Sequence, residues 1–367
     1  MVSEQTMVDT ALVAMRSEYD ALVEQGERWS LRALFSTPDR DIEDYCREFR
    51  PNRFGEHALA EVERFCRRHR IWLESGGAHY NSMTPYLHPN AVTAERMTII
   101  GIFNAILFWL NDTVGREKFA HLSEDEQLRA SYTAGRLRDM LESRSPAADP
   151  SREEIATAEF LDLLARDAEP VWLDRFLSST AEHLRTAIRN QNTDARGGLL
   201  SVAEYIDLRS EVSGMYPAIA MCEFGRDDYL PWDLIPADVP AAQLRRLQQL
   251  TAEIGALMND MFSFEKECIA DGADFNLIPV WLLNTPGATL ADAVHGSAAI
   301  VRDRLTEFHT LSEQILNEYV ARAERRAAES VAAHVRDLVG CVQATWAWEI
   351  VTPRYKGVSI FDENHAV

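Results

Sequence analysis

Apolar residues recur along this chain at intervals of about 3.6 positions, and the strict alternation that marks a half-buried strand is nearly absent. We therefore expect an all-α fold. The periodicity predicts helices over residues 6–26, 56–74, 91–111, 123–143, 152–167, 171–193, 199–221, 238–270, 297–325 and 327–350.

Turn-forming segments separate these helices, for example between Ser145 and Pro150 and at Thr352-Pro353. The polar caps and acids of residues 149–154 are typical of a helix start. No linker is long enough to divide the chain. We expect a single helical domain over residues 56–367, with residues 1–55 forming an N-terminal extension packed on it.

Composition narrows the class of protein. The chain has 367 residues, 46% of them hydrophobic, and no run of 18 apolar residues, which indicates a soluble globular protein without a membrane span. The first ten residues lack the basic and apolar regions of a signal peptide. Five scattered cysteines without a CxxC pair fit reduced thiols, so we expect a cytoplasmic location.

The net charge of −21 argues against binding to nucleic acid or to an anionic membrane by charge attraction. If the ligand of so acidic a chain is itself an anion, cations must be imported to hold it. This is a reason to expect metal.

Three oxygen-bearing side chains recur every four residues: Asn259, Ser263 and Glu267. On a helix they lie along one stripe, about 40° and 6 Å apart per step. Helical side chains lean toward the N-terminus, so the longer Glu267 reaches back toward the other two. An amide oxygen, a hydroxyl and a carboxylate that converge in this way suit Mg²⁺ shared with a phosphate.

A solvated polar stripe is the ordinary explanation of such a series. The neighbours favour another one. The same face carries Ala252, Gly255 and Ala256 just before the stripe, and Lys266 is the only other polar residue near its centre. We therefore interpret this face as the wall of a cavity with a polar floor.

Three further segments pair with this stripe. An apolar helix from Phe103 ends in Asn111-Asp112, which could supply metal from the opposite wall. Arg209 offers a planar donor fork for phosphate oxygens, and Ser213-Gly214 after it indicates a helix break. Trp346 and Trp348 run into Arg354-Tyr355. Taken singly, these features are more typical of a helix cap running into a loop, a surface ion pair and an aromatic core helix.

In combination and order they resemble the class I terpene synthases of bacteria and fungi. The family's pattern Asn-Asp-x-x-Ser-x-x-x-Glu is met by Asn259, Asp260, Ser263 and Glu267, and its C-terminal signature by Arg354-Tyr355 with Trp348 six residues earlier. Residues 108–112 are similar to the end of the helix that carries the aspartate-rich motif. The resemblance spans about residues 85–356 and implies a helical bundle that encloses a central cavity.

Two departures from the family pattern matter. Asn111 replaces the usual first aspartate, and the next acid, Glu117, lies about 140° from Asp112 on an unbroken helix, so it can join a metal site only if the helix ends or kinks near Gly115. Arg209 lies 50 residues before Asn259, slightly more than is usual, and Val212 stands where a polar residue is common.

The resemblance implies Mg²⁺-dependent ionisation and cyclisation of a prenyl diphosphate, farnesyl or geranylgeranyl, to a cyclic hydrocarbon or alcohol. It implies metal binding by Asp112, Asn259, Ser263 and Glu267, with Asn111 and Glu117 as further candidates. It implies diphosphate binding by Arg209, Lys266, Arg354 and Tyr355, and an effector carbonyl at Ser213. The aromatic candidates for facing the carbocation are Phe108 and Trp348 first, then Trp109, Phe262 and Trp346.

Other functions remain open at this point. Prenyl chain elongation uses the same metal and substrates but normally needs two aspartate-rich motifs. A catalytically degenerate protein that only binds an isoprenoid diphosphate is a second alternative. A di-iron bundle is set aside because no histidine has a glutamate three residues before it. Whether the chain forms a homodimer is left open.

Overall fold

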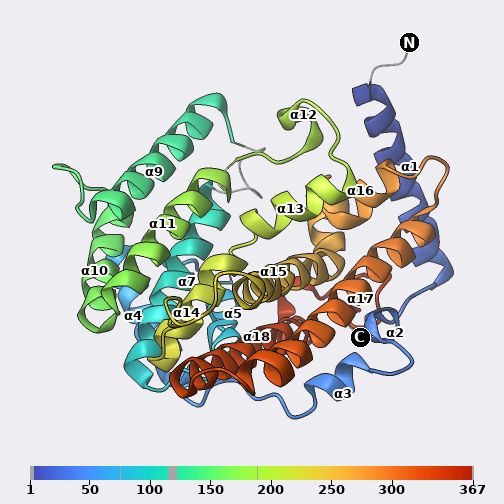
Figure 1. The fold of residues 1–367 in the computed structure, drawn as a ribbon. Helices are drawn as coiled ribbons and strands as arrows, with labels where there is room; N and C mark the ends of the chain where they lie inside the picture. The colour runs from blue at the N-terminus through green and yellow to red at the C-terminus, as the bar shows by residue number, and fades with distance from the viewer. Residues whose placement is uncertain (1–3, 75, 115–121, 188, 366–367) are drawn as a thin grey trace.

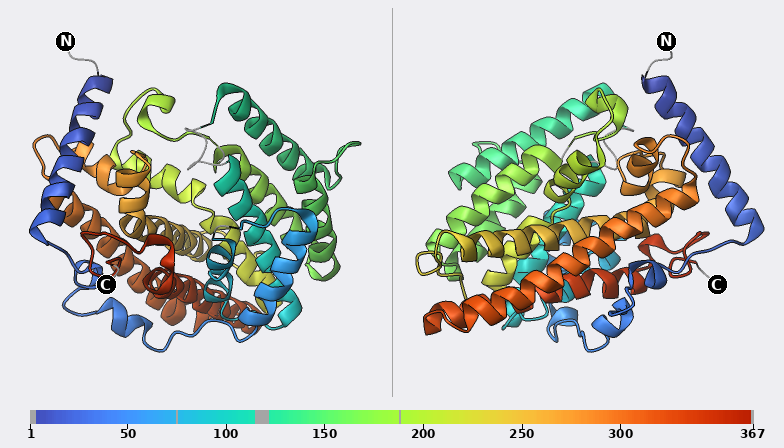
Figure 2. Two further views of the ribbon diagram at one scale, coloured as in Figure 1. Left: turned by 180° about the vertical axis from the view of Figure 1, so that it is seen from behind. Right: turned by 45° about the vertical axis from the view of Figure 1, so that its right-hand side comes forward.

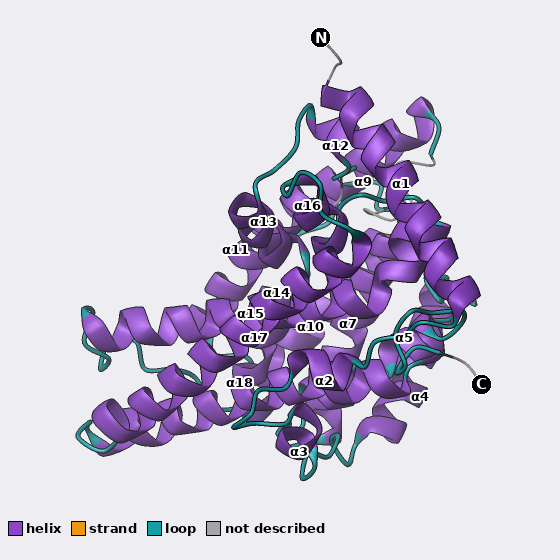
Figure 3. Ribbon diagram, turned by 90° about the vertical axis from the view of Figure 1, so that its right-hand side faces the viewer, coloured by secondary structure: helices purple, strands orange, loops and turns teal. Residues whose placement is uncertain are grey.

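The computed structural model describes residues 4–365 except 75, 115–121 and 188. Over this part of the chain the fold is built from helices, and no β-strand forms (Figure 3). The helices are α1 (Glu4–Gln25), α2 (Leu31–Phe35), α3 (Ile42–Cys46), α4 (Gly55–His69), α5 (Gly77–Asn81), α6 (Thr84–Leu87), α7 (Ala94–Val114), α9 (Glu124–Ser143), α10 (Arg152–Asp167), α11 (Pro170–Ala187), α12 (Thr193–Arg196), α13 (Val202–Val212), α14 (Met215–Arg226), α15 (Val239–Phe264), α16 (Leu277–Leu283), α17 (Leu290–Gln314) and α18 (Arg325–Val351). Two π-helical segments, η1 (Glu265–Ala270) and η2 (Ile315–Val320), continue α15 and α17, and a 3₁₀ turn, η3 (Pro353–Tyr355), follows α18.

Helix α15 forms the centre of the bundle (Figure 1). It packs against α13, α14, α16, α17 and α18. Its apolar side chains from Leu244 to Met261 are buried on nearly every side, which is the pattern of a helix enclosed by others. Burial of this apolar surface is the main source of the fold's stability.

The buried apolar side chains form two hydrophobic cores. One surrounds α15, α17 and α18, and the other lies among α4, α7, α10 and α11. The elements that border the space between the cores are α7, α11, α13, α15 and α18. Most of the residues predicted to carry chemistry lie on these elements, and Lys266, Glu267, Arg354 and Tyr355 lie on η1 and η3, which follow α15 and α18.

The N-terminal helices lie against one side of the bundle (Figure 2). Helix α1 packs on α16 and α17, and α2 packs on α17. The segment after η3, residues 356–365, runs between these helices and α15, and we call it the C-terminal tail. The backbone amide of Trp29 donates to the Ile360 carbonyl at 2.9 Å, and the side-chain Nδ2 of Asn364 donates to the Phe262 carbonyl at 2.7 Å. The division into an extension (1–55) and a domain (56–367) stays a prediction.

The long helices follow the hydrophobic periodicity, with some corrections. The start expected at residues 149–154 is a capping box between Ser151 and Glu154. The range 199–221 holds two helices, α13 and α14, divided at the break that Ser213-Gly214 indicates. Helix α17 begins at Leu290 rather than near 297, because Thr289 and Asp292 form a capping box there.

Within the described residues, no helix combines the length and the apolar character needed to cross a membrane. All five cysteines are buried free thiols. The Sγ atoms of Cys222 and Cys341 nevertheless lie only 3.7 Å apart, a proximity that their spacing in the sequence does not indicate.

Candidate active site

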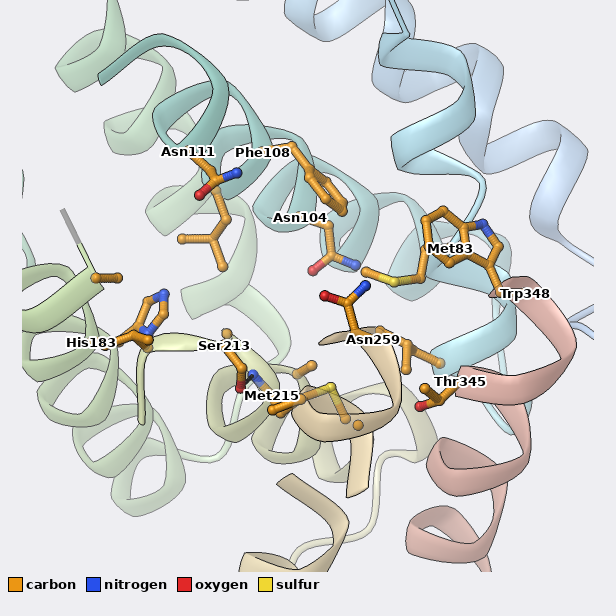
Figure 4. A pocket seen from close by; sticks show the side chains of 18 of the residues that line it. Met83, Asn104, Phe108, Asn111, His183, Ser213, Met215, Asn259, Thr345 and Trp348 are labelled. Atoms are coloured by element: carbon orange, nitrogen blue, oxygen red, sulfur yellow. Dashed lines mark hydrogen bonds between the residues drawn. The ribbon is translucent and has the colours of Figure 1, made fainter. Parts of the chain in front are cut away.

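A cavity of about 180 Å³ lies between the two cores, and its lining side chains come from α6, α7, α11, α13, α14, α15, α18 and η3 (Figure 4). One water needs roughly 10–15 Å³ measured in the same way, so the space admits a molecule much larger than water. The predicted site residues that line it are Phe108, Asn111, Arg209, Ser213, Asn259, Trp348, Arg354 and Tyr355.

The cavity wall formed by α15 carries small residues first and a polar residue one turn later. Gly255 and Ala256 line the cavity one turn before Asn259. A Cβ atom at Gly255 would stand 2.8 Å from Cε of Met215, so the absence of a side chain lets α14 approach closely. The small residues that the sequence places on this face therefore shape the cavity wall.

The oxygen stripe crosses a change of helix type. Asn259 is half-buried, whereas Ser263 and Glu267 are buried, and the helix becomes π-helical at Glu265. A π-turn bonds residues five apart and is wider than an α-turn, so a step of four residues comes nearer to one full turn. Glu267 thus lies closer to the line of Ser263 than a regular α-helix would place it.

Asn259 joins three elements. Its Oδ1 accepts from Nη2 of Arg209 at 3.1 Å, and its Nδ2 donates to Oε1 of Glu349 at 2.8 Å and to the hydroxyl of Tyr355 at 3.0 Å. These bonds fix the amide between α13, α18 and η3. A ligand that draws on this amide has to exchange some of them.

Arg209 is held by a buried carboxylate. Its Nε donates to Oδ1 of Asp260 at 2.7 Å, and the Tyr205 hydroxyl donates to Oδ2 of the same carboxylate at 2.5 Å. The Leu277 amide adds a third bond to Asp260 at 3.1 Å. Burial alone would lower the pKa of Arg209, but the adjacent Asp260 charge outweighs it and the pKa stays above its usual range. The guanidinium is therefore a fixed cation at the cavity.

The opposite wall is the end of α7. Asn111 lines the cavity and donates to Oδ1 of Asp112 at 3.1 Å, and Oδ2 of Asp112 lies 3.8 Å from Nη1 of Arg354. The guanidinium of Arg354 also stands 4.1 Å from the centre of the Tyr80 ring. The Arg354 side chain thus contacts both the end of α7 and α5. Glu117 falls outside the described residues.

The aromatic candidates divide into two groups. Phe108 and Trp348 line the cavity, and the Trp348 indole donates to Oγ of Ser82 at 3.0 Å, which fixes its ring. Phe262 and Trp346 do not line it, because they pack edge to face in the core with centroids 5.8 Å apart. Trp109 is also outside the lining: it is buried, with the Arg152 guanidinium 5.4 Å above its ring.

Two other predicted residues have distinct surroundings. Lys266 is not part of the lining and pairs with Asp271 at 3.6 Å, although its charge acts on Tyr80 beside the cavity. Ser213 ends α13 at the cavity, and its hydroxyl donates to the Ser210 carbonyl at 2.8 Å. Gly214 follows with φ +82°, the left-handed conformation that favours glycine.

Two titratable residues of the lining, Glu349 and His183, were not predicted from the sequence. Burial raises the pKa of Glu349 to about 8, and its Oε2 has no hydrogen-bond partner among the described residues. The signal that could have identified Glu349 was its position directly after the tryptophans Trp346 and Trp348 on α18. His183 falls in the same row of α11 as the apolar Trp172 and Phe176, eleven and seven residues earlier, which was a weaker signal.

The stripe on α15 meets the requirements of a hard cation. The buried hydroxyl of Ser263 has no hydrogen-bond partner among the described residues, and it lies between the Asn259 amide and the Glu267 carboxylate in the chain. In the part of the chain that the structure describes, no three His, Cys, Asp or Glu side chains gather as a metal site. The donors here are instead a mixed set of neutral and anionic oxygens, which fits a divalent cation that takes its remaining ligands from a bound diphosphate.

Comparisons with known proteins identify the class. The model of the family described as "Terpene synthase family 2, C-terminal metal binding" matches residues 102–307, more than half of the chain. The chain belongs to this family, and the protein is a class I terpene synthase, a class of enzyme that acts on prenyl diphosphates with a divalent metal. This membership does not favour chain elongation or a degenerate binding protein.

Individual relatives are distant. The chain is 25% identical to "Sesquiterpene synthase 6" of Postia placenta over 278 residues, 76% of each chain. It is 26% identical to "7-epi-alpha-eudesmol synthase ((2E,6E)-farnesyl diphosphate cyclizing)" of Streptomyces viridochromogenes over 57% of this chain and 62% of that protein. The crystal structure of an α-eudesmol synthase superposes with a TM-score of 0.69 at 21% identity, covering 83% of this chain and 97% of the other, which shows the shared all-α fold.

Proposed function

We propose that the protein catalyses the Mg²⁺-dependent ionisation and cyclisation of farnesyl diphosphate to a cyclic sesquiterpene hydrocarbon or alcohol, with release of diphosphate. The observation that carries the proposal is the oxygen stripe of α15 and η1. It places the Ser263 hydroxyl, unpartnered among the described residues, one turn after Asn259, and Asn259 lines the cavity together with Asn111 at the end of α7. The chain length of the substrate is taken from the relatives, one of which is named as cyclising farnesyl diphosphate.

Metal would be held by Asn259, Ser263 and Glu267 on one wall and by Asp112 on the other, with Asn111 beside it. Bound there, it would supply Lewis-acid stabilisation of the departing diphosphate. Glu117 remains a candidate ligand by its sequence position only.

Four donors would receive the diphosphate oxygens: Arg209, Arg354, Tyr355 and, from the rim, Lys266. Arg209 is the best positioned of them, because the bond from Nε to Asp260 leaves the guanidinium edge with Nη2 pointing at Asn259. A charge-assisted bond from such a fixed donor costs little reorganisation when negative charge develops on the leaving group.

The hydrocarbon would lie among apolar and aromatic side chains. Phe108 and Trp348 present rings to the cavity, and each ring would stabilise a passing carbocation by about 0.5–2 kcal/mol through cation–π attraction. The apolar lining from Leu107, Leu184 and Met215 would keep water away from the cation. The Ser213 carbonyl at the helix break would face the reacting end of the chain.

The test is turnover by the purified protein with Mg²⁺ and, separately, geranyl, farnesyl and geranylgeranyl diphosphate. Diphosphate release is measured alongside gas chromatography–mass spectrometry of the extracts. We expect a cyclic C15 product from farnesyl diphosphate. Longer linear diphosphates would instead establish chain elongation, and binding without turnover would establish a degenerate protein.

Two serines provide a matched pair for the metal assignment. Ser263 and Ser297 are both fully buried with unpartnered hydroxyls among the described residues. Ser263 lies one turn after Asn259 in the oxygen stripe, whereas Ser297 lies on α17, away from the stripe. Ser263→Ala should lower diphosphate release at least tenfold and weaken the binding of Mg²⁺ and inorganic diphosphate in calorimetry. Ser297→Ala should change neither. Equal effects of the two substitutions would refute the assignment.

A further inference from the structure

A terpene cyclisation has to dispose of one proton. Loss of diphosphate leaves a carbocation, and a neutral product forms only when a C–H bond breaks to give an alkene or when an added water loses a proton to give an alcohol. The inference below rests on the proposed cyclisation and concerns the group that takes this proton.

His183 is placed in the cavity wall opposite Trp348. It comes from α11, is half-buried, and stands beside Ser213 at the helix break (Figure 4). A Cβ atom at Gly214 would be 3.9 Å from both Cε1 and Nε2 of the ring, so this edge of the imidazole borders the backbone of the break. The missing side chain of Gly214 leaves this edge open.

A hydrogen bond fixes the tautomer of His183. Nδ1 lies 3.0 Å from the carbonyl oxygen of Glu211, and a carbonyl only accepts, so Nδ1 carries the hydrogen. Burial lowers the pKa of His183, and the bond to Glu211 opposes that shift in part. In the neutral ring Nε2 then carries a lone pair, and it has no hydrogen-bond partner among the described residues.

The carbonyl that orients the ring also prepares it for charge. Glu211 is the penultimate residue of α13, so its carbonyl is one of the last four that the helix leaves unpaired. The C-terminal end of a helix carries partial negative charge, which stabilises a nearby cation. The bond from Nδ1 therefore strengthens when Nε2 takes up a proton.

The other polar side chains of the lining are poor proton acceptors. Asn104, Asn111 and Thr345 offer amides or a hydroxyl, and Arg209 and Arg354 are cations. Oε1 of Glu349 already accepts from Asn259, and burial raises the pKa of this carboxyl to about 8, so it already carries a proton near neutral pH. His183 is the one neutral nitrogen base that the described lining presents beside the apolar side chains of Leu184, Ala187 and Met215.

We propose that Nε2 of His183 accepts the proton that ends the reaction. The C–H bond next to the final cation breaks, its electron pair forms the alkene, and the proton goes to Nε2. In a reaction that ends in an alcohol, Nε2 takes the proton of the water that has bonded to the cation. The imidazolium gives the proton to solvent once product and diphosphate have left.

His183→Asn tests the proposal, because the Asn amide places an N–H donor near the position of Nδ1 but has no basic nitrogen. We expect diphosphate release within about threefold of wild type, since ionisation does not use His183. The share of the main wild-type product should fall at least fivefold, with products of earlier cations in its place. Circular dichroism and thermal melting verify that the variant is folded.

His183→Ala with added imidazole provides the second measurement. Imidazole should restore the main product at least threefold in this variant and leave His183→Asn unchanged, because Asn fills the space. An unchanged product profile in His183→Asn overturns the proposal. So does a parallel fall of diphosphate release and all products without any effect of imidazole, which would mark His183 as structural. If wild type itself releases no diphosphate from any prenyl substrate, it is the proposed function that fails.

Discussion

Asn259 and Asp260 are adjacent in the chain but lie on different faces of α15. Asn259 points into the cavity, whereas Asp260 is fully buried behind it and binds Arg209, Tyr205 and the Leu277 amide. The family pattern contains both residues but does not show that one lines the cavity while the other holds Arg209 in place. Asp260 is a positioning residue, since its contacts are with Arg209 and its surroundings rather than with the cavity.

Asp260→Asn should therefore act mainly on stability. Removing one partner of a buried ion pair leaves the other charge uncompensated, which costs about 3–5 kcal/mol. Asp112→Asn is the comparison, because Oδ2 of Asp112 lies 3.8 Å from Nη1 of Arg354, farther than the 2.7 Å between Asp260 and Arg209; we expect a smaller loss of stability than for Asp260→Asn, but loss of diphosphate release. Urea unfolding measures the first effect, and a diphosphate assay the second. A fully stable Asp260→Asn would contradict this division.

At the scale of elements, the break between α13 and α14 is the most specialised feature. It ends α13 at Ser213, turns the chain at Gly214 with φ +82°, and brings the ring of His183 against the turn. Gly197 offers an independent comparison, because it has φ +80° after α12 and a Cβ there would meet nothing within 4 Å.

Gly214→Ala and Gly197→Ala should each cost about 1–2 kcal/mol, because a residue with Cβ is strained in the left-handed region. Only Gly214→Ala should change the product composition, since its methyl group would touch the ring of His183. Thermal unfolding and product analysis of both variants check this. If Gly197→Ala shifted the products as strongly, the local account of the break would be wrong.

The long helices and the break could be predicted because their signals are local. Periodicity over fifteen or more residues identifies a helix, and a glycine after a serine marks its end. Helix α16 was missed because Leu277–Leu283 is a short, wholly apolar run that periodicity cannot classify. The π-turn after Phe264 was missed because nothing in the run Glu265–Ala270 distinguishes it from an α-helix.

The site was predictable to the same extent. The four-residue spacing of Asn259, Ser263 and Glu267 is a local pattern. The bond from Asn259 to Glu349 joins residues 90 apart, and that from His183 to Glu211 joins residues 28 apart. Such contacts depend on how the helices pack. A single sequence does not show which residues of one helix lie opposite which residues of another.

At the scale of the whole molecule, the high acidic content includes carboxyls that the fold keeps neutral. Glu223 on α14 is buried, accepts the Leu230 amide at 2.8 Å, and lies 3.8 Å from Arg175. Burial raises its pKa to about 7 despite these contacts. The folded protein therefore binds a proton at Glu223 that the unfolded chain loses near its ordinary pKa of 4.5.

This difference predicts a pH dependence of stability. The contribution is fully present below about pH 4.5 and is lost as pH rises through 7, because the unfolded state then binds fewer protons than the folded one. The free energy of unfolding of wild type should fall relative to that of Glu223→Gln between pH 5 and 8, by roughly 3 kcal/mol at 1.4 kcal/mol per pKa unit. Urea titrations across this range measure it. Parallel curves would mean that Glu223 is ionised in the folded protein.

The C-terminal tail connects distant parts of the molecule. Carboxylate oxygens of Glu363 accept from the backbone amides of Leu31 and Arg32 at the start of α2, at 2.7 and 2.9 Å. A few residues earlier, Tyr355 bonds Asn259 inside the cavity. The start of α2 is therefore linked to the site through residues 355–363, although it contributes no side chain to the cavity lining. Laboratory evolution for altered products should for this reason recover substitutions at residues 29–32, and libraries confined to the cavity wall would overlook them.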